Sequence, residues 1–193
     1  MTIKKLVIPI LASVCISCGS DPLPKPKAML RLEYPPAKYV KVDVLLPFTF
    51  EKNELANQIK NIKMDGVNDV IGVDVGYTSL KGTIYLTYKK VENGNLNKLL
   101  TDAQELTQKH TIKADEIEGV LYENPKHNVF GMFYEVGGNA ASQSQFYVTD
   151  STKNFLIGSL YFYAKPNYDS ILPAAEYLKK DIKHIMETVE WKE

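Results

Sequence analysis

Three stretches in the second half of the chain combine strand-like composition with very short connections. They are Val129–Val136, Gln145–Thr149 and Phe155–Ala164, all with aromatic or β-branched residues. A parallel crossover needs a dozen or more residues, so strands this close together are expected to pair antiparallel. Between the last two stretches, residues 150–154 (Asp-Ser-Thr-Lys-Asn) are typical of a turn and predict a hairpin. This region therefore constrains the fold to one built on an antiparallel sheet.

The hydrophobic pattern predicts further elements around that sheet. Apolar residues recur at helical spacing in Asn95–His110 and Ser170–Val189, and a short helix is expected at Glu54–Ile62 on the same criterion. Additional strands are expected at Met29–Tyr34, Val42–Phe50 and Leu80–Val91. A chain of 193 residues usually forms one domain. The prediction is a single α+β domain over residues 29–193, with an antiparallel β-sheet covered by helices.

The N-terminal segment resembles the signal peptide of a bacterial lipoprotein. Lys4 and Lys5 precede the apolar run Leu6–Ile16, which is shorter than the roughly 20 residues that span a bilayer. Ser17 then stands before Cys18, as in a lipobox. We expect a signal peptide over residues 1–17, a lipid on Cys18, and a Pro-rich tether over residues 18–28. An ordinary cleaved signal and a buried N-terminal strand are the alternatives.

The two cysteines show the spacing of a thioredoxin-like redox pair, Cys15-x-x-Cys18. A redox pair is expected where a strand meets a helix inside the fold, whereas this pair lies in an apolar leader. If the leader is removed, Cys15 is lost and Cys18 carries the lipid. The redox interpretation is therefore rejected.

Composition and motifs favour a non-catalytic protein without cofactor or metal. Lys plus Arg and Asp plus Glu both number 23, which gives no electrostatic footprint for nucleic acid. Phosphate-binding loops, nucleophile elbows and zinc-protease motifs do not occur in the sequence. His110, His127 and His184 fall in different expected elements, without ligand spacing. A site assembled in three dimensions, for example with Asp115 or Glu116, stays open as an alternative.

Two regions are candidates for binding a partner. Residues 137–144 (Gly-Gly-Asn-Ala-Ala-Ser-Gln-Ser) permit close backbone approach, so they form either a recognition loop or a hairpin connection with a bulge. Tyr161 and Tyr163 lie on the same side of a strand, where they form either a ligand-binding face or part of the core. The candidate partner-binding residues are Gly137, Gly138, Asn139, Ser142, Gln145, Tyr161 and Tyr163.

Several of these segments resemble one known family. They are residues 137–142 (Gly-Gly-Asn-Ala-Ala-Ser), 145–152 (Gln-Phe-Tyr-Val-Thr-Asp-Ser-Thr), 160–162 (Leu-Tyr-Phe), 166–170 (Pro-Asn-Tyr-Asp-Ser) and 80–89 (Leu-Lys-Gly-Thr-Ile-Tyr-Leu-Thr-Tyr-Lys). Together they are similar to the gliding motility lipoprotein GldD family of Bacteroidota. The likeness extends from the lipobox to near Trp191. The order of strands and helices also resembles a PsbP/Mog1-like sandwich, an analogy at the level of fold alone.

The resemblance implies a non-catalytic component of the gliding apparatus that works with type IX protein secretion. We expect a cell-envelope lipoprotein, held on a membrane by its lipid, whose periplasmic domain binds other gliding and secretion proteins. The sequence leaves open whether the inner or the outer membrane carries the lipid. The alternative function is a periplasmic small-ligand-binding module that uses the loop at residues 137–144 and the nearby tyrosines.

Overall fold

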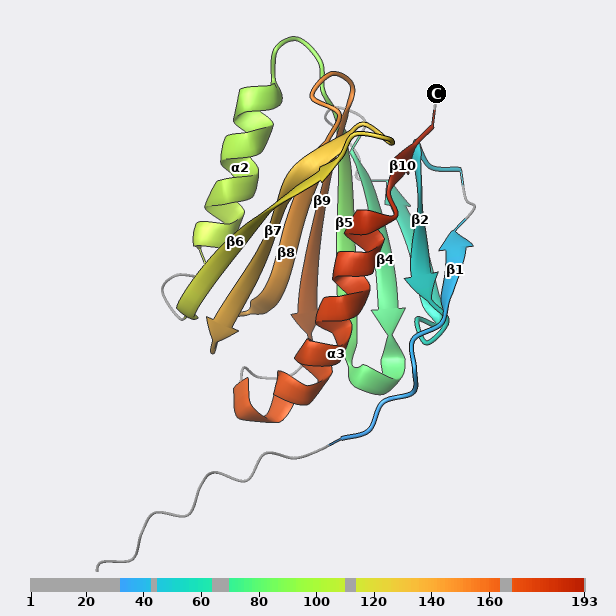
Figure 1. Ribbon diagram of the computed structural model, residues 1–193, viewed down its shortest axis with the longest axis vertical. Coiled ribbons are helices and arrows are strands. Elements are labelled where there is room, and N and C mark those ends of the chain that lie inside the picture. The colour runs from blue at the N-terminus through green and yellow to red at the C-terminus, as the bar shows by residue number, and fades with distance from the viewer. Residues whose placement is uncertain (1–31, 43–44, 64–69, 110–113, 164–167, 193) are drawn as a thin grey trace, which may run out of the picture.

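The computed structural model describes residues 32–42, 45–63, 70–109, 114–163 and 168–192 (Figure 1). The expected signal peptide, Cys18 and the tether lie outside these residues. The described chain begins beside the N-terminal part of helix α3 (Tyr168–Glu187), and its last strand ends near the opposite end of the same helix.

Two antiparallel sheets make up most of the fold. The larger sheet has seven strands in the order β3-β4-β5-β9-β8-β7-β6, and the smaller sheet has three in the order β1-β2-β10. The strands of the larger sheet are β3 Gln58–Lys63, β4 Ile71–Tyr77, β5 Gly82–Lys90, β6 Ala114–Asn124, β7 Val129–Gly138, β8 Ser142–Thr149 and β9 Asn154–Phe162. Those of the smaller sheet are β1 Tyr39–Val42, β2 Phe48–Asn53 and β10 Glu190–Trp191.

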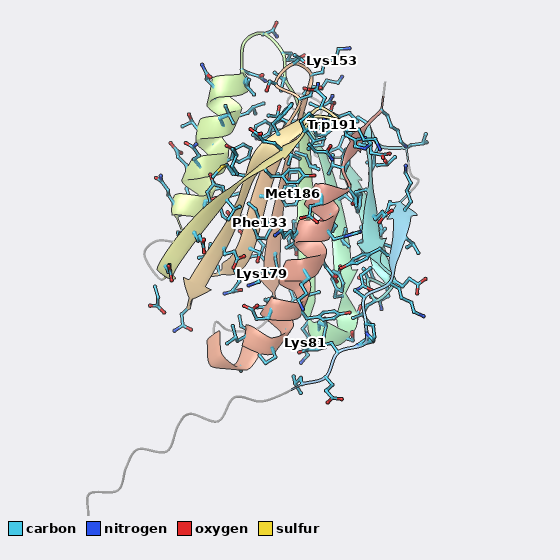
Figure 2. The ribbon with its side chains drawn as sticks, viewed as in Figure 1. Lys81, Phe133, Lys153, Lys179, Met186 and Trp191 are labelled. Atoms are coloured by element: carbon cyan, nitrogen blue, oxygen red, sulfur yellow. The ribbon has the colours of Figure 1, made fainter. Side chains whose placement is uncertain are left out.

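The helices lie on opposite faces of the larger sheet (Figure 1). Helix α3 and the smaller sheet cover one face, and the main core lies between these layers. Figure 2 labels Phe133 of β7 and Met186 of α3, which belong to this core. Helix α2 (Leu96–Gln108) packs on the other face through Leu99 and Ala103, which meet Tyr147 and Phe155. A single-turn 3-10 helix, η2 (Thr78–Leu80), connects β4 to β5.

The alternating pattern of β5 explains why both faces of the sheet can be built from one strand. Ile84 and Leu86 are at most 1% exposed and belong to the core on the α3 side. Thr83 and Tyr85 point to the other face because successive side chains of a strand alternate. In α3, Pro173 is the sixth residue of the helix, so it lacks the backbone N–H that would pair with the carbonyl four residues earlier.

The predicted α+β domain with an antiparallel sheet and two long helices is confirmed. The helix expected at Glu54–Ile62 is wrong, because β3 begins at Gln58 and pairs with β4. Its three apolar residues matched the helical period over too short a run to decide between helix and strand. The strand expected over Val42–Phe50 is interrupted: β1 ends at Val42 and β2 begins at Phe48, directly after Pro47.

The N-terminal strand expected at Met29–Tyr34 is not found in its described part, since residues 32–34 have no strand partner. Residues 29–31 lie outside the described residues. The pattern also missed β4, β6 and β10. β4 does alternate, with Ile71, Val73, Val75 and Tyr77 on the core side, so its pattern could have been recognised. β6 and β10 lack such a run, and the pairing with their neighbours defines them.

Candidate functional site

Helix α2 covers only part of its face of the larger sheet. Its apolar contacts reach β7, β8 and β9. Within the described part of the chain, no helix packs on the same face over β3, β4 and β5. The strand register places Tyr85 between Asp74 of β4 and Ser159 of β9, and Thr83 between Gly76 and Tyr161. The uncovered half of the sheet is therefore polar and aromatic.

A connected group of hydroxyl-bearing side chains lies on this uncovered half. The Tyr163 hydroxyl is 2.9 Å from the Thr83 Oγ1 atom and 2.9 Å from the Tyr85 hydroxyl. The rings of Tyr85 and Tyr161 meet edge to face, with centroids 5.8 Å apart. Tyr163 is 69% exposed. We call Thr83, Tyr85, Tyr161 and Tyr163 the tyrosine face.

The hydroxyl groups of the tyrosine face affect each other's acidity. The hydrogen bond with Tyr163, with burial as a second cause, raises the pKa of Tyr85 to about 12. The hydrogen bonds with Thr83 and Tyr85 lower the pKa of Tyr163. The Tyr85 hydroxyl therefore stays protonated at neutral pH and acts as a hydrogen-bonding group.

A groove opens beside the tyrosine face, at the end of the sheet where β4 turns into β5. Its volume is about 450 Å³, and it is lined by Gln58, Gly76, Tyr77, Thr78, Lys81, Gly82, Thr83 and Tyr163. Small-molecule sites commonly have volumes of roughly 300–1,000 Å³. The lining offers an aromatic ring, hydroxyl and amide groups and one lysine, which suits stacking and hydrogen bonding.

The groove beside the tyrosine face thus has a volume of about 450 Å³, and Tyr163 forms one of its walls. Lys81 is tied to this wall, because its backbone carbonyl accepts a hydrogen bond of 2.8 Å from the Tyr163 backbone N–H. The sequence pattern did not identify Gln58 or Gly76 as part of a site. Both enter it through the β3–β4 pairing, which places them opposite each other.

The loop predicted at residues 137–144 forms the tight connection of a hairpin. Strand β7 ends at Gly138 and β8 begins at Ser142, and the β8–β9 register shifts between Ser142 and Gln145. Gly138 has a φ of 86°, and a Cβ there would lie 2.6 Å from a carboxylate oxygen of Asp115. Only a glycine fits this position without strain.

The structure brings some of the predicted binding residues together and separates others. Ser142 lies opposite Tyr161, so the end of the hairpin connection adjoins the tyrosine face. Ser142 is 0% exposed and Gln145 is 2% exposed, and the Gln145 Oε1 atom accepts a hydrogen bond of 2.9 Å from the Thr107 hydroxyl of α2. Gly137 is half-buried and Asn139 is exposed. Asn139 and Tyr163 are the accessible members of the predicted set.

A second polar cluster, which the sequence pattern did not reveal, lies between α3 and the smaller sheet. Asp181 of α3 is 1% exposed, and its carboxylate accepts hydrogen bonds from the Tyr39 hydroxyl at 2.9 Å and the Asn53 amide at 3.0 Å. Burial raises the pKa of Asp181, although these hydrogen bonds oppose the shift. His184 stacks on the Tyr39 ring at 3.6 Å and lies 2.8 Å from a Glu51 carboxylate oxygen.

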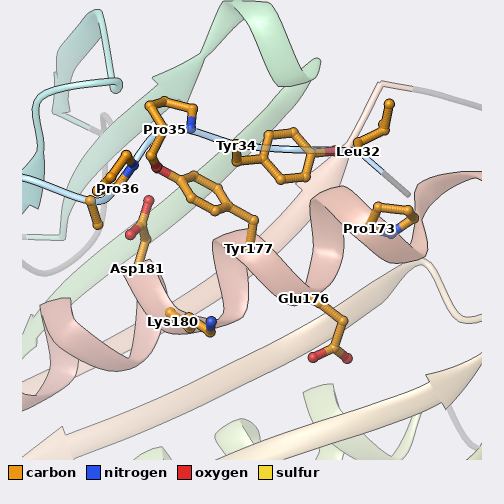
Figure 3. Close-up of a pocket in the computed structure, with 10 residues that line it drawn as sticks. Leu32, Tyr34, Pro35, Pro36, Pro173, Glu176, Tyr177, Lys180 and Asp181 are labelled. Atoms are coloured by element: carbon orange, nitrogen blue, oxygen red, sulfur yellow. The ribbon is translucent and has the colours of Figure 1, made fainter. Parts of the chain in front are cut away.

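The N-terminal end of the described chain is attached to α3 next to this cluster (Figure 3). The Tyr177 hydroxyl donates a hydrogen bond of 2.9 Å to the Pro35 carbonyl, and the rings of Tyr34 and Tyr177 lie 4.9 Å apart. A groove of about 480 Å³ separates residues 32–37 from the helix. These contacts set the place where the chain leaves the domain toward its N-terminus.

Two negative findings concern the described residues. Among them, no group of three or more His, Cys, Asp or Glu side chains could hold a metal ion. Likewise, no helix in the described ranges is both long and apolar enough to cross a membrane.

The fold and the site define an α+β domain that presents a hydrogen-bonded aromatic face on a half-covered antiparallel sheet. The family model described as "Gliding motility lipoprotein GldD" matches residues 19–191, and the chain belongs to this family. The resemblance seen in the sequence is thereby confirmed. No curated protein and no solved structure matches the chain.

Proposed function

We propose that this protein is a membrane-anchored component of the gliding motility and type IX secretion machinery that acts by binding other envelope proteins. Membership of the GldD lipoprotein family over residues 19–191 supports this proposal. The lipid is carried by Cys18 and the folded domain lies in the periplasm. Several acyl chains make such an anchor stable, whereas a single chain would bind only marginally.

The anchor raises the effective concentration of the domain near membrane partners. Leu32, the first described residue, stands fourteen positions after Cys18. A fully extended chain of this length reaches at most about 50 Å. Because the Tyr177–Pro35 hydrogen bond holds the chain against α3, the tether is expected to join the domain beside Tyr177.

The exposed tyrosine face is the observation that best supports a protein-binding role. Tyrosines are enriched where proteins meet, since the ring offers apolar area and the hydroxyl a hydrogen bond. Here the Tyr163 ring is exposed while its hydroxyl is held by Thr83 and Tyr85. A side chain that is already ordered loses little entropy when a partner binds.

Substitution of Tyr163 tests this surface in the full-length, lipid-anchored protein. After cross-linking in cells, gliding and secretion proteins that co-purify are quantified by mass spectrometry. Tyr163→Ala removes the ring and is expected to lower co-purification about tenfold, the effect of losing roughly 1.4 kcal/mol of binding energy. Tyr163→Phe keeps the ring and is expected to have a smaller effect.

Leu45→Ala serves as the matched control, because Leu45 is 100% exposed and lies between β1 and β2 of the smaller sheet, which covers the opposite face of the larger sheet. Its co-purification should equal that of the wild type. Unchanged co-purification of a folded Tyr163→Ala variant would exclude the tyrosine face as the contact surface.

The groove of about 450 Å³ favours a second candidate function, the binding of a small periplasmic ligand. Native mass spectrometry of the full chain purified from membranes tests it. A bound mass of a few hundred daltons that is lost in Gln58→Leu, which alters the exposed lining of the groove, is the expected result. The same spectrum for wild type and variant would contradict ligand binding in this groove.

A further inference from the structure

The outer edge of β6 is a long strand edge that the described part of the chain leaves unpaired. β6 is the last strand of the larger sheet and pairs with β7 alone. It extends over 11 residues. Half of the backbone N–H and C=O groups of an edge strand point away from the sheet and can pair with another extended chain. β6 therefore offers a template for strand addition.

Both faces of this edge expose apolar side chains. Val120 is 47% exposed and Leu121 is 66% exposed. Val120 lies opposite Phe133 of the main core, and Leu121 lies opposite Met132, which packs against the α2 cluster. A strand added outside β6 would cover Val120 on one face and Leu121 on the other. It would thus extend the two hydrophobic layers of the domain.

The charge of the edge is uniformly negative. β6 contains Asp115, Glu116, Glu118 and Glu123, all exposed, and no Lys or Arg. Within the described ranges, none of these carboxylates forms an ion pair with a basic side chain. Glu135, the residue opposite Glu118, is instead paired with Lys179 at 3.1 Å. An incoming strand with basic side chains would find carboxylates without competing partners.

We infer that the free edge of β6 receives an extended, basic segment of a partner protein by strand addition. The segment has two adjacent apolar residues, which contact Val120 and Leu121, and lysines or arginines on either side. A second copy of this chain is a poor occupant, because pairing through its own β6 would bring carboxylates together, and like charges across a strand pair are destabilising. This surface is separate from the tyrosine face, since β7 and β8 lie between β6 and β9.

A synthetic peptide serves as the probe for the full-length chain in detergent. It carries a fluorophore, a central Val-Val pair, and alternating lysine and threonine on both sides. One control peptide has glutamate in place of lysine, and another keeps the lysines but has prolines that prevent strand pairing. Fluorescence anisotropy measures binding, and amide hydrogen exchange locates the protected backbone.

Charge reversal on the protein provides the matched comparison. Glu118→Lys combined with Glu123→Lys alters the edge, while Glu54→Lys combined with Glu92→Lys makes the same charge change at exposed positions outside β6. The first pair is expected to weaken binding of the lysine peptide about tenfold, and the second pair less than twofold. Exchange of β6 amides should slow only when the lysine peptide is bound.

Three results would overturn the inference. Equal binding of the proline peptide would mean attraction by charge alone, without strand pairing. Protection that appears outside β6 would assign the peptide to another surface. An oligomer of the full chain in light scattering that dissociates on the Glu118 and Glu123 substitutions would assign the edge to a second copy. Each of these readouts is independent of Tyr163, so the tyrosine-face proposal is tested separately.

Discussion

The buried carboxylate of Asp181 allows a prediction whose sign and size both follow from the structure. Asp181 lies in α3 with 1% of its surface exposed and accepts hydrogen bonds from the Tyr39 hydroxyl and the Asn53 amide. Asp181→Ala removes the acceptor for both donors. Asp181→Asn keeps one amide oxygen in the same place and removes the charge.

The two substitutions should differ in cost. A buried donor left without an acceptor costs about 1–3 kcal/mol. Asn53 is 3% exposed and keeps its hydrogen bond of 3.0 Å to the Tyr177 hydroxyl, so one of its two amide N–H groups bears this cost, whereas Tyr39 is half-buried and can partly turn to water. Asp181→Ala is therefore expected to lower the free energy of unfolding by about 2–4 kcal/mol. Asp181→Asn should cost about 1 kcal/mol or less at neutral pH, since it retains an acceptor.

The pH dependence gives the sharper test. Burial raises the folded-state pKa of Asp181 above its ordinary value of 3.8, so the folded protein holds this proton more tightly than the unfolded chain. The stability linked to this group is complete below pH 3.8 and is lost as the pH rises through the folded pKa. Asp181→Asn does not titrate, so its stability relative to wild type should improve as the pH rises from 3.8 through the folded pKa of Asp181.

Urea unfolding of both proteins between about pH 4 and pH 8 measures this difference. Asp102→Asn is the control, because Asp102 is exposed on α2, and its difference from wild type should stay nearly constant. A difference for Asp181→Asn that is constant, or that moves in favour of wild type as the pH rises, would refute the reasoning.

Three further predictions concern turns, strand spacing and the anchor. Gly131→Ala should lower the free energy of unfolding in urea by at least about 2 kcal/mol, because the new Cβ would overlap the Tyr147 carbonyl. At Gly137 the nearest atom to a new Cβ is 3.8 Å away, so Gly137→Ala should change the free energy of unfolding by less than about 0.5 kcal/mol. Similar values for both variants would contradict the predicted overlap. Burial alone would raise the pKa of Asp150, but three backbone N–H groups and a side-chain amide hydrogen-bond to its carboxylate and together lower it. The stability that ionised Asp150 contributes is therefore present above pH 3.8 and lost as the pH falls through the lowered pKa. Asp150→Asn should lower the free energy of unfolding by about 2 kcal/mol at pH 7 and by progressively less in acid. A loss that grows in acid would contradict this assignment. Mass spectrometry of the N-terminal peptide should find an acyl group on Cys18, and Cys18→Ala should leave the membrane fraction; an unmodified peptide would remove the anchor from the proposal.

The long, regular elements could be predicted because each is specified by its own residues. Leu80–Val91 and Phe155–Ala164 correspond closely to β5 and β9, and the two long amphipathic helices were found at their places. In each, one side faces a core, so the apolar period appears directly in the sequence. β6 lacks this signal because both of its faces are exposed, and its acidic residues hide a strand that pairing with β7 creates.

The candidate site, too, could be predicted from the sequence only in part. Alternation alone placed Tyr161 and Tyr163 on one side of their strand. It could not show that Tyr163 is exposed, because exposure depends on how far α2 extends over the sheet. The hydrogen-bond partners of Tyr163, Thr83 and Tyr85, come from another strand, 80 and 78 residues earlier in the chain.

The sequence by itself determined the antiparallel character of the sheet, the two long helices and the family. These features depend on residues close together in the chain or on a pattern that extends along it. Only the tertiary structure decided which half of the sheet stays uncovered, which carboxylates are buried and which strand has a free edge. Those properties arise from contacts between distant segments, and the free energy of such contacts depends on packing that no local pattern records.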